Sequence, residues 1–132
     1  MTTEGVKPPA CMPMIRTIAM PADANANGDI FGGWLMSQMD LAAGNQAARV
    51  AHGRCVTVAV EAMSFLRPVK VGDEVTVYCE PLSTGRTSIN ISVEAWRRER
   101  SEEVDQQVTK AVFKFVAIDA EGRPRPIKKD AG

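Results

Sequence analysis

The sequence has no long hydrophobic run, and this absence argues against two classes of protein. No stretch approaches the roughly 20 apolar residues that a helix needs to cross a bilayer, so we expect no membrane span. The first residues, MTTEGVKPPACMPM, contain no apolar run of signal-peptide length. We therefore expect residues 1–13 to form a flexible leader rather than a targeting segment.

The sequence also lacks paired cysteines and a net charge. Its three cysteines, Cys11, Cys55 and Cys79, are odd in number and form no C-x-x-C motif. A reduced, cytoplasmic setting without a metal site is the simplest account of them. Sixteen basic residues balance sixteen acidic ones, so the composition gives no reason to expect DNA or another nucleic acid as the main partner.

What the sequence does contain is enough for one domain of mixed structure. We expect this domain at residues 14–120, followed by a basic, proline-containing and loosely held tail at 121–132. Residues 33–51 have a helical period, and strand patterns occupy 14–20, 56–66, 74–82, 86–97 and 108–118. This order predicts an α+β fold, an antiparallel sheet with one long helix across a face. One helix covers such a sheet poorly, so we expect self-association.

The expected helix carries an isolated carboxylate, Asp40, within its apolar side. That side comprises Met36, Ala43, Ala47, Gly33, Ala51, Gly44, Ser37, Ala48, Leu41 and Trp34. A carboxylate placed there costs free energy unless it is hydrogen-bonded, and folds tolerate this cost most readily where the group does chemistry. The alternative is a structural aspartate that is bonded to the backbone or to Asn25.

Several motifs together resemble one known family. The run NANGDIFGGW at 25–34, followed by MSQMD at 36–40, is similar to the opening of the central helix in YciA-like acyl-CoA thioesterases. Further similar segments are TVAVEAMSF at 57–65, RP through GD at 67–73, GRTS at 85–88 and AVFKFVA at 111–117. The resemblance covers about residues 16–123. It implies a hotdog fold, in which a five-stranded antiparallel sheet wraps around the helix. It also implies active sites at a dimer interface and commonly a hexamer built as a trimer of dimers.

The resemblance implies hydrolysis of acyl-CoA thioesters to free CoA and a carboxylic acid. Asp40 matches the catalytic aspartate of the family, which would deprotonate water as a general base or, alternatively, attack the thioester to form an anhydride. Gly33, with Gly32 and Trp34, would offer free N–H groups to the thioester oxygen at the positive end of the helix dipole. Asn25 matches an asparagine that assists catalysis in related thioesterases, although a turn-forming role is equally open.

Four further residues are candidate contacts of the CoA moiety: Arg67, Arg86, Thr87 and Ser88. Guanidinium groups, hydroxyls and backbone N–H groups at a tight turn can converge on phosphate, although ordinary solvation of strand ends is the alternative. No cofactor is expected, since CoA is part of the substrate and product.

A non-catalytic acyl-CoA sensor is the alternative function, because a sensor needs the pocket but no base. Hydration or dehydration of an acyl thioester would require a histidine near Gly33. The single histidine, His52, lies twelve residues after Asp40, about 18 Å along the helix, and cannot serve it in the same subunit.

Overall fold

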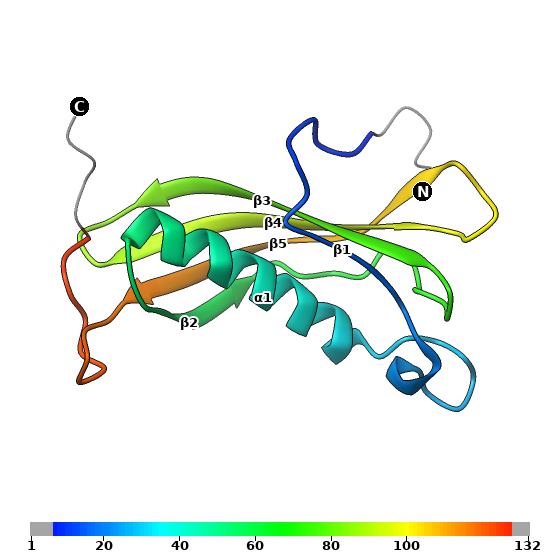
Figure 1. Ribbon diagram of the computed structural model, residues 1–132, viewed down its shortest axis with the longest axis horizontal. Coiled ribbons are helices and arrows are strands. Elements are labelled where there is room, and N and C mark those ends of the chain that lie inside the picture. The colour runs from blue at the N-terminus through cyan, green and yellow to red at the C-terminus, as the bar shows by residue number, and fades with distance from the viewer. Residues whose placement is uncertain (1–6, 128–132) are drawn as a thin grey trace.

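The computed structural model describes residues 7–127, and within that range the chain forms one long helix and a five-stranded sheet. The elements are β1 (Ile15–Ile18), a 3-10 turn (Pro21–Asp23), α1 (Gly32–Ala51), β2 (Cys55–Glu61), β3 (Glu74–Thr84), β4 (Ser88–Arg98) and β5 (Asp105–Ala117). All strand pairs are antiparallel in the order β1-β3-β4-β5-β2, and α1 lies across one face (Figure 1). This arrangement confirms the predicted α+β class. Residues 1–6 of the expected leader and 128–132 of the expected tail lie outside the described residues.

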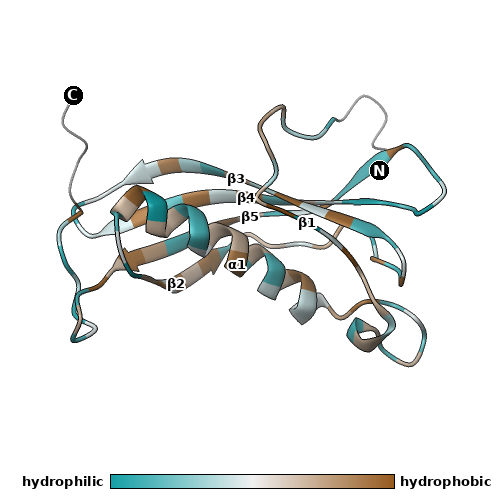
Figure 2. Ribbon diagram, viewed as in Figure 1, coloured by the Kyte–Doolittle hydropathy of each residue, from teal (hydrophilic) through white to brown (hydrophobic). Residues whose placement is uncertain are grey.

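The hydrophobic core fills the space between α1 and the inner face of the sheet. Alternate residues of the central strands are fully buried there: Val75, Val77, Ile89, Ile91, Val93, Phe113 and Phe115. Figure 2 shows hydrophobic and hydrophilic bands alternating along the strands and the helix, as expected for elements with one buried side. A Cβ on Gly44 would lie 3.7 Å from the Phe115 ring, so the helix packs closely on β5. No helix of the described chain is long and apolar enough to cross a membrane.

The buried stripe of α1 is rotated away from the one that the sequence predicts. The prediction left Leu35 and Met39 out of the apolar side, but their exposed fractions are only 2% and 0%. Met36 and Leu41, which the prediction placed inside it, are 38% and 63% exposed. Leu35, Met39, Ala42 and Ala43 recur at the spacing of one helical face, and it is this face that packs on the sheet. Asp40 therefore lies at the border of the buried stripe and is half-buried.

The expected strand at 56–66 is shorter than predicted, because its last residues leave the sheet. β2 ends at Glu61, and Ala62 adopts a left-handed backbone conformation with φ 56°. The following segment returns to the sheet through one hydrogen bond, in which the Leu66 N–H donates to the Val108 carbonyl at 2.7 Å. β2 forms one edge of the sheet, and its Val56, Val58 and Val60 side chains are exposed. The detached segment 62–69 thereby becomes a wall beside the start of α1.

The remaining strand boundaries differ from the predictions by a few residues. β3 continues to Thr84 instead of ending at residue 82, and its pairing with β4 shifts between Pro81 and Ser83. Proline has no N–H to donate to a neighbouring strand, which accounts for an irregularity at this place. β4 extends to Arg98 and β5 already begins at Asp105, so the connection between these two strands is shorter than expected.

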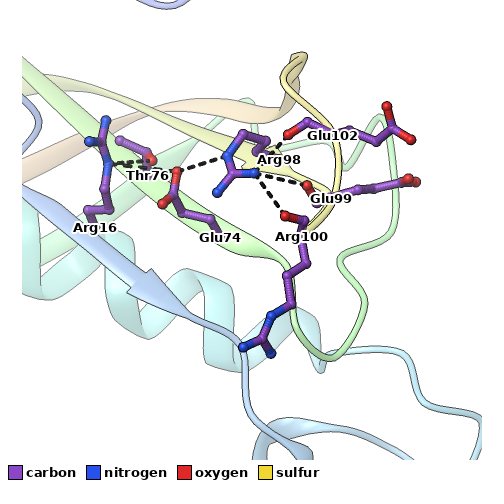
Figure 3. A network of polar contacts seen from close by, with 7 residues as sticks. All are labelled: Arg16, Glu74, Thr76, Arg98, Glu99, Arg100 and Glu102. Atoms are coloured by element: carbon purple, nitrogen blue, oxygen red, sulfur yellow. Dashed lines mark hydrogen bonds and ion pairs between the residues drawn. The ribbon is translucent and has the colours of Figure 1, made fainter.

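Arg98 organises the charged hairpin between β4 and β5 (Figure 3). Its Nη1 donates to the carbonyls of Glu99 at 3.2 Å, Arg100 at 3.2 Å and Glu102 at 2.7 Å. Its Nε lies 3.4 Å from Glu74 Oε1, and the same carboxylate oxygen lies 3.9 Å from Arg16 Nε. One arginine therefore connects the hairpin to β3.

The tail after β5 is held more firmly than the sequence predicts. The Arg125 guanidinium donates from Nη2 to the Ala51 carbonyl at 3.1 Å and from Nε to the Ile118 carbonyl at 3.0 Å. The Ile127 N–H donates to the Arg86 carbonyl at 2.9 Å. The expectation of a loosely held tail is wrong as far as residue 127. The Arg125 guanidinium is hydrogen-bonded to the carbonyl of Ala51, the last residue of α1, where the negative end of the helix dipole favours a cation.

Candidate active site

Asp40 on α1 and Thr57 on β2 are joined side chain to side chain. Thr57 Oγ1 donates a hydrogen bond of 2.5 Å to Asp40 Oδ1, a length typical of a hydroxyl bonded to a carboxylate. Thr57 pairs with the core residue Phe115, and the pairing then shifts between Thr57 and Ala59. A bulge of this kind re-aims the side chains of an edge strand. Within the part of the chain that the structure describes, Asp40 is thus held by Thr57 and by neither the backbone nor Asn25.

Asp40 also lines an open cavity. This cavity of about 340 Å³, here called the Asp40 cavity, is lined by Gly33, Met36, Ser37, Asp40, Thr57, Val60 and Phe113. Within residues 7–127, Asp40 Oδ2 has no hydrogen-bond partner. One carboxylate oxygen is therefore fixed, while the other is available to a molecule in the cavity. An oriented carboxylate beside apolar walls can accept a proton from a bound water molecule.

The start of α1 presents two backbone N–H groups to this region. Gly32 and Gly33 are the first residues of the helix, and within the described chain their N–H groups have no acceptor. The Trp34 N–H donates to the Phe31 carbonyl at 3.1 Å, so the expectation of a free donor at Trp34 is wrong. The reason is a tight first turn, which uses the third N–H locally. Gly33 and Asp40 line the same cavity.

The loop before α1 is fixed by its own polar groups. Asn25 Oδ1 accepts hydrogen bonds from the N–H groups of Asn27 at 2.9 Å and Asp29 at 3.2 Å. Asp29 in turn pairs with the Lys70 ammonium, and the Ile30 N–H donates to the Val69 carbonyl at 2.8 Å. The carboxamide oxygen of Asn25 thus closes the loop, and Asn25 does not line the Asp40 cavity. Its Nδ2 group has no partner in the described chain and is the part left for a ligand.

A second cavity lies at the other side of the helix start. It measures about 380 Å³ and is here called the Phe65 cavity. Its lining residues are Ile30, Phe31, Gly32, Leu35, Phe65, Leu66, Arg67, Pro68, Val69 and Val108. Arg67 Nη1 donates to the Gln107 carbonyl at 2.7 Å, which ties this predicted CoA contact to β5.

The other predicted CoA contacts lie at the opposite end of the sheet. Arg86 and Thr87 lie in the turn between β3 and β4, and Ser88 begins β4; this turn lies near the end of α1 rather than its start (Figure 1). Arg86 lines a separate cavity with Pro126 and Ile127. Within one chain, the structure therefore does not bring this turn to Asp40, which lies eleven residues, or about 17 Å, before the end of α1.

Thr57 is the site residue that the sequence interpretation missed. It enters the sequence analysis only as the first residue of the TVAVEAMSF segment at 57–65. Its signal was a hydroxyl side chain between Val56 and Val58, in a strand that packs beside the helix of Asp40. Among the described residues, no group of three or more histidine, cysteine, aspartate or glutamate side chains is placed to bind a metal ion.

Comparison with known proteins points to one family. The family model of the thioesterase superfamily matches residues 27–104. The acyl-CoA thioester hydrolase YciA of Escherichia coli K12 is 55% identical over 117 residues, which cover 86% of this chain and 89% of that protein.

Solved structures agree with this match. HI0827, a hexameric broad specificity acyl-coenzyme A thioesterase, has a TM-score of 0.89 at 48% identity, covering 98% of this chain and 90% of that one. Its structure is also known with an aspartate replaced by alanine. A hexameric hotdog fold thioesterase from Campylobacter jejuni has a TM-score of 0.82 at 34% identity, covering 88% and 90%. These similarities confirm the expected hotdog fold and the resemblance on which it was based.

Proposed function

Because the chain belongs to the thioesterase superfamily, and within it to the YciA-like acyl-CoA thioesterases, we propose that it hydrolyses acyl-CoA thioesters. The products are free CoA and a carboxylic acid. The observation that carries this proposal is the pairing of Asp40 and Thr57 in a cavity that also contains Gly33. A sensor needs the cavity alone, whereas a positioned carboxylate with one unused oxygen serves hydrolysis.

In the proposed reaction, Asp40 acts as the general base. Thr57 holds Oδ1, so Oδ2 faces the cavity and takes a proton from a water molecule. The oxygen of that water attacks the thioester carbonyl carbon, and the tetrahedral intermediate then expels the CoA thiolate, which takes up the proton that Asp40 removed from the water. Direct attack by the carboxylate to form an anhydride is the alternative route, and it uses the same oxygen.

The start of α1 stabilises the charge that develops on the thioester oxygen. The N–H groups of Gly33 and Gly32 point out of the helix with no acceptor in the described chain. Two such donors, together with the positive end of the helix dipole, match an oxyanion better than a neutral carbonyl. Asn25 contributes its Nδ2 group to the substrate or the water, while its Oδ1 keeps the loop in place.

We further propose that the complete site forms between subunits of a dimer, and that dimers assemble into a hexamer. Two relatives of known structure are described as hexameric. The exposed β2 edge, with Val56, Val58 and Val60, offers apolar surface for such an association. Arg86, Thr87 and Ser88 lie far from the start of their own helix, so they contact CoA that is bound to a partner subunit. No cofactor takes part, and a cytoplasmic location stays the prediction from cysteine usage.

The test is release of CoA from a panel of acyl-CoA substrates, followed by spectrophotometry of the free thiol. Native protein should hydrolyse several of them, and Asp40→Asn should lower kcat about 10²- to 10⁴-fold, because it removes the base. The matched control is Asp105→Asn at the start of β5, outside the Asp40 and Phe65 cavities, which should leave kcat unchanged. Unimpaired hydrolysis by Asp40→Asn would exclude this mechanism, and binding of CoA without any hydrolysis by native protein would indicate a sensor.

A further inference from the structure

An ion pair between Lys70 and Asp29 joins the turn at 70–73 to the loop before α1, and the mechanism has given it no role. Gly32 and Gly33, the donors to the oxyanion, follow Asp29 by three and four residues. We propose that Lys70 and Asp29 are positioning residues, whose ion pair holds the N–H groups of these two glycines at the place where the oxyanion develops. This inference rests on the proposed thioesterase function and adds two residues to its machinery.

The turn at 70–73 is anchored in the interior of the protein. Asp73 is only 4% exposed, and its Oδ2 accepts a hydrogen bond of 2.9 Å from the backbone N–H of Lys70. The same oxygen lies 3.4 Å from Nη1 of Arg97, whose Nη2 donates to Gln106 Oε1 at 2.8 Å. A buried ion pair with further hydrogen bonds fixes the groups that form it. The Lys70 ammonium therefore extends from a rigid part of the fold.

Two contacts connect this turn and the residue before it to the loop that leads into α1. The Ile30 N–H donates to the Val69 carbonyl at 2.8 Å, and the neighbouring Asp29 and Lys70 form an isolated antiparallel bridge as well as the ion pair. The hydrogen bonds to the Asn25 carboxamide close the loop on itself and do not tie it to the sheet. The ion pair thus adds a second point of attachment beside the backbone hydrogen bond, and two points fix the direction in which the chain enters the helix.

The location of the pair separates positioning from both catalysis and stability. Neither Asp29 nor Lys70 lines the Asp40 cavity or the Phe65 cavity, so the pair acts through the helix start and not on the substrate. The two side chains are 37% and 52% exposed, and an exposed ion pair contributes little to the free energy of folding. A displacement of a catalytic group by about 1 Å, in contrast, can lower a rate about 100-fold. Loss of the pair should therefore change the rate far more than the stability.

Three variants and one control test the inference with propionyl-CoA as the substrate. Lys70→Met removes the ammonium, and Asp29→Asn removes the opposite charge at nearly constant shape. Each should lower kcat at least about tenfold, with KM changed by less than about twofold and the melting temperature unchanged. Lys70→Arg keeps a cation and should retain most of kcat. The matched control is Arg16→Met, because Arg16 is 56% exposed and lies 3.9 Å from the Glu74 carboxylate. This control should have the native kcat.

The double variant Asp29→Asn with Lys70→Met shows whether the two residues act as a pair. Its kcat should be no lower than that of the slower single variant, about tenfold below native, whereas independent effects would multiply to about 100-fold. Multiplying losses would overturn the inference. So would native kcat in both single variants, while the hydrolase function would stand.

Two further results would also count against positioning. A rise in KM at unchanged kcat would make Lys70 a substrate contact, and a loss of kcat that matches the unfolded fraction, measured by circular dichroism, would make the pair merely structural. Should Lys70→Met fold poorly, the comparison of Asp29→Asn with native protein decides the question. If native protein hydrolyses none of the acyl-CoAs, the proposed function is wrong and the inference fails with it.

Discussion

The Thr57 hydroxyl donates to the Asp40 carboxylate at 2.5 Å, which joins an edge strand to the central helix across 17 residues of chain. Because Thr57 takes only Oδ1, Oδ2 has no hydrogen-bond partner within residues 7–127, and Asp40 lines the Asp40 cavity. A threonine hydroxyl turns about a single side-chain torsion, and its branched Cβ restricts that torsion in a strand. This pair is the most specific element of the proposed site.

Removal of the Thr57 hydroxyl should impair the chemical step and leave substrate binding intact. Thr57→Val keeps the shape of the side chain but donates no hydrogen bond, so kcat should fall about 10- to 100-fold with little change in KM. Thr57→Ser restores the donor and should recover most of kcat. Steady-state kinetics of the two variants measure this difference. A loss of equal size in both variants would show that the hydroxyl alone does not account for the effect, and full activity of Thr57→Val would show that the hydroxyl is not needed.

Gly33→Ala should make the protein less active without making it less stable. A Cβ added to Gly33 would have no atom of the chain within 4 Å of it. Gly33 lines the Asp40 cavity, however, and the added methyl group would occupy space that the thioester needs to approach the backbone. We expect kcat/KM to fall at least about tenfold and the melting temperature to stay the same or rise, because alanine favours helix.

Gly44→Ala is the matched control for this variant. It lies in the same helix, and its Cβ would lie 3.7 Å from the Phe115 ring, an ordinary contact. It should stabilise the protein by up to about 1 kcal/mol with unchanged activity. Calorimetry and the CoA-release assay measure both quantities, and full activity of Gly33→Ala would remove Gly33 from the oxyanion site.

Arg125→Gln should destabilise the fold by about 1–2 kcal/mol, because it removes two hydrogen bonds from a half-buried cation to the Ala51 and Ile118 carbonyls. Denaturant unfolding measures the change. Arg123→Gln is the control, since Arg123 makes its hydrogen bonds to Asp119 through the backbone. Equal stability of Arg125→Gln and native protein would mean that the tail contributes nothing to holding the helix end.

Cysteine alkylation should separate the three thiols. Burial and the nearby Cys11 raise the pKa of Cys79 to about 12, and burial raises the pKa of Cys55 although the Arg125 guanidinium opposes it. Both groups are therefore protonated thiols at pH 8, and thiols react slowly with iodoacetamide. Cys11 is exposed, so mass spectrometry should find one rapid modification per chain, at Cys11. Rapid modification of Cys79 in folded protein would contradict its burial.

Much of the architecture could be predicted because the signals are local. The helix at 33–51 was predicted within one residue of α1, since its period is that of a helix throughout. The end of β2 was missed because the apolar residues after Glu61, including Phe65 and Leu66, resemble a continued strand. Only the left-handed conformation of Ala62 directs them away from the sheet and into the wall of a cavity.

The sequence alone determined the order of the elements and the residue types at the helix start, because hydrophobic period, turn residues and glycines act over a few neighbouring positions. The tertiary structure decided which side of α1 is buried, since that depends on how Leu35 and Met39 fill the space against the sheet. It also decided that Thr57 meets Asp40, because that contact requires both the rotation of the helix and the bulge in β2. Neither of these is a property of a short segment of chain.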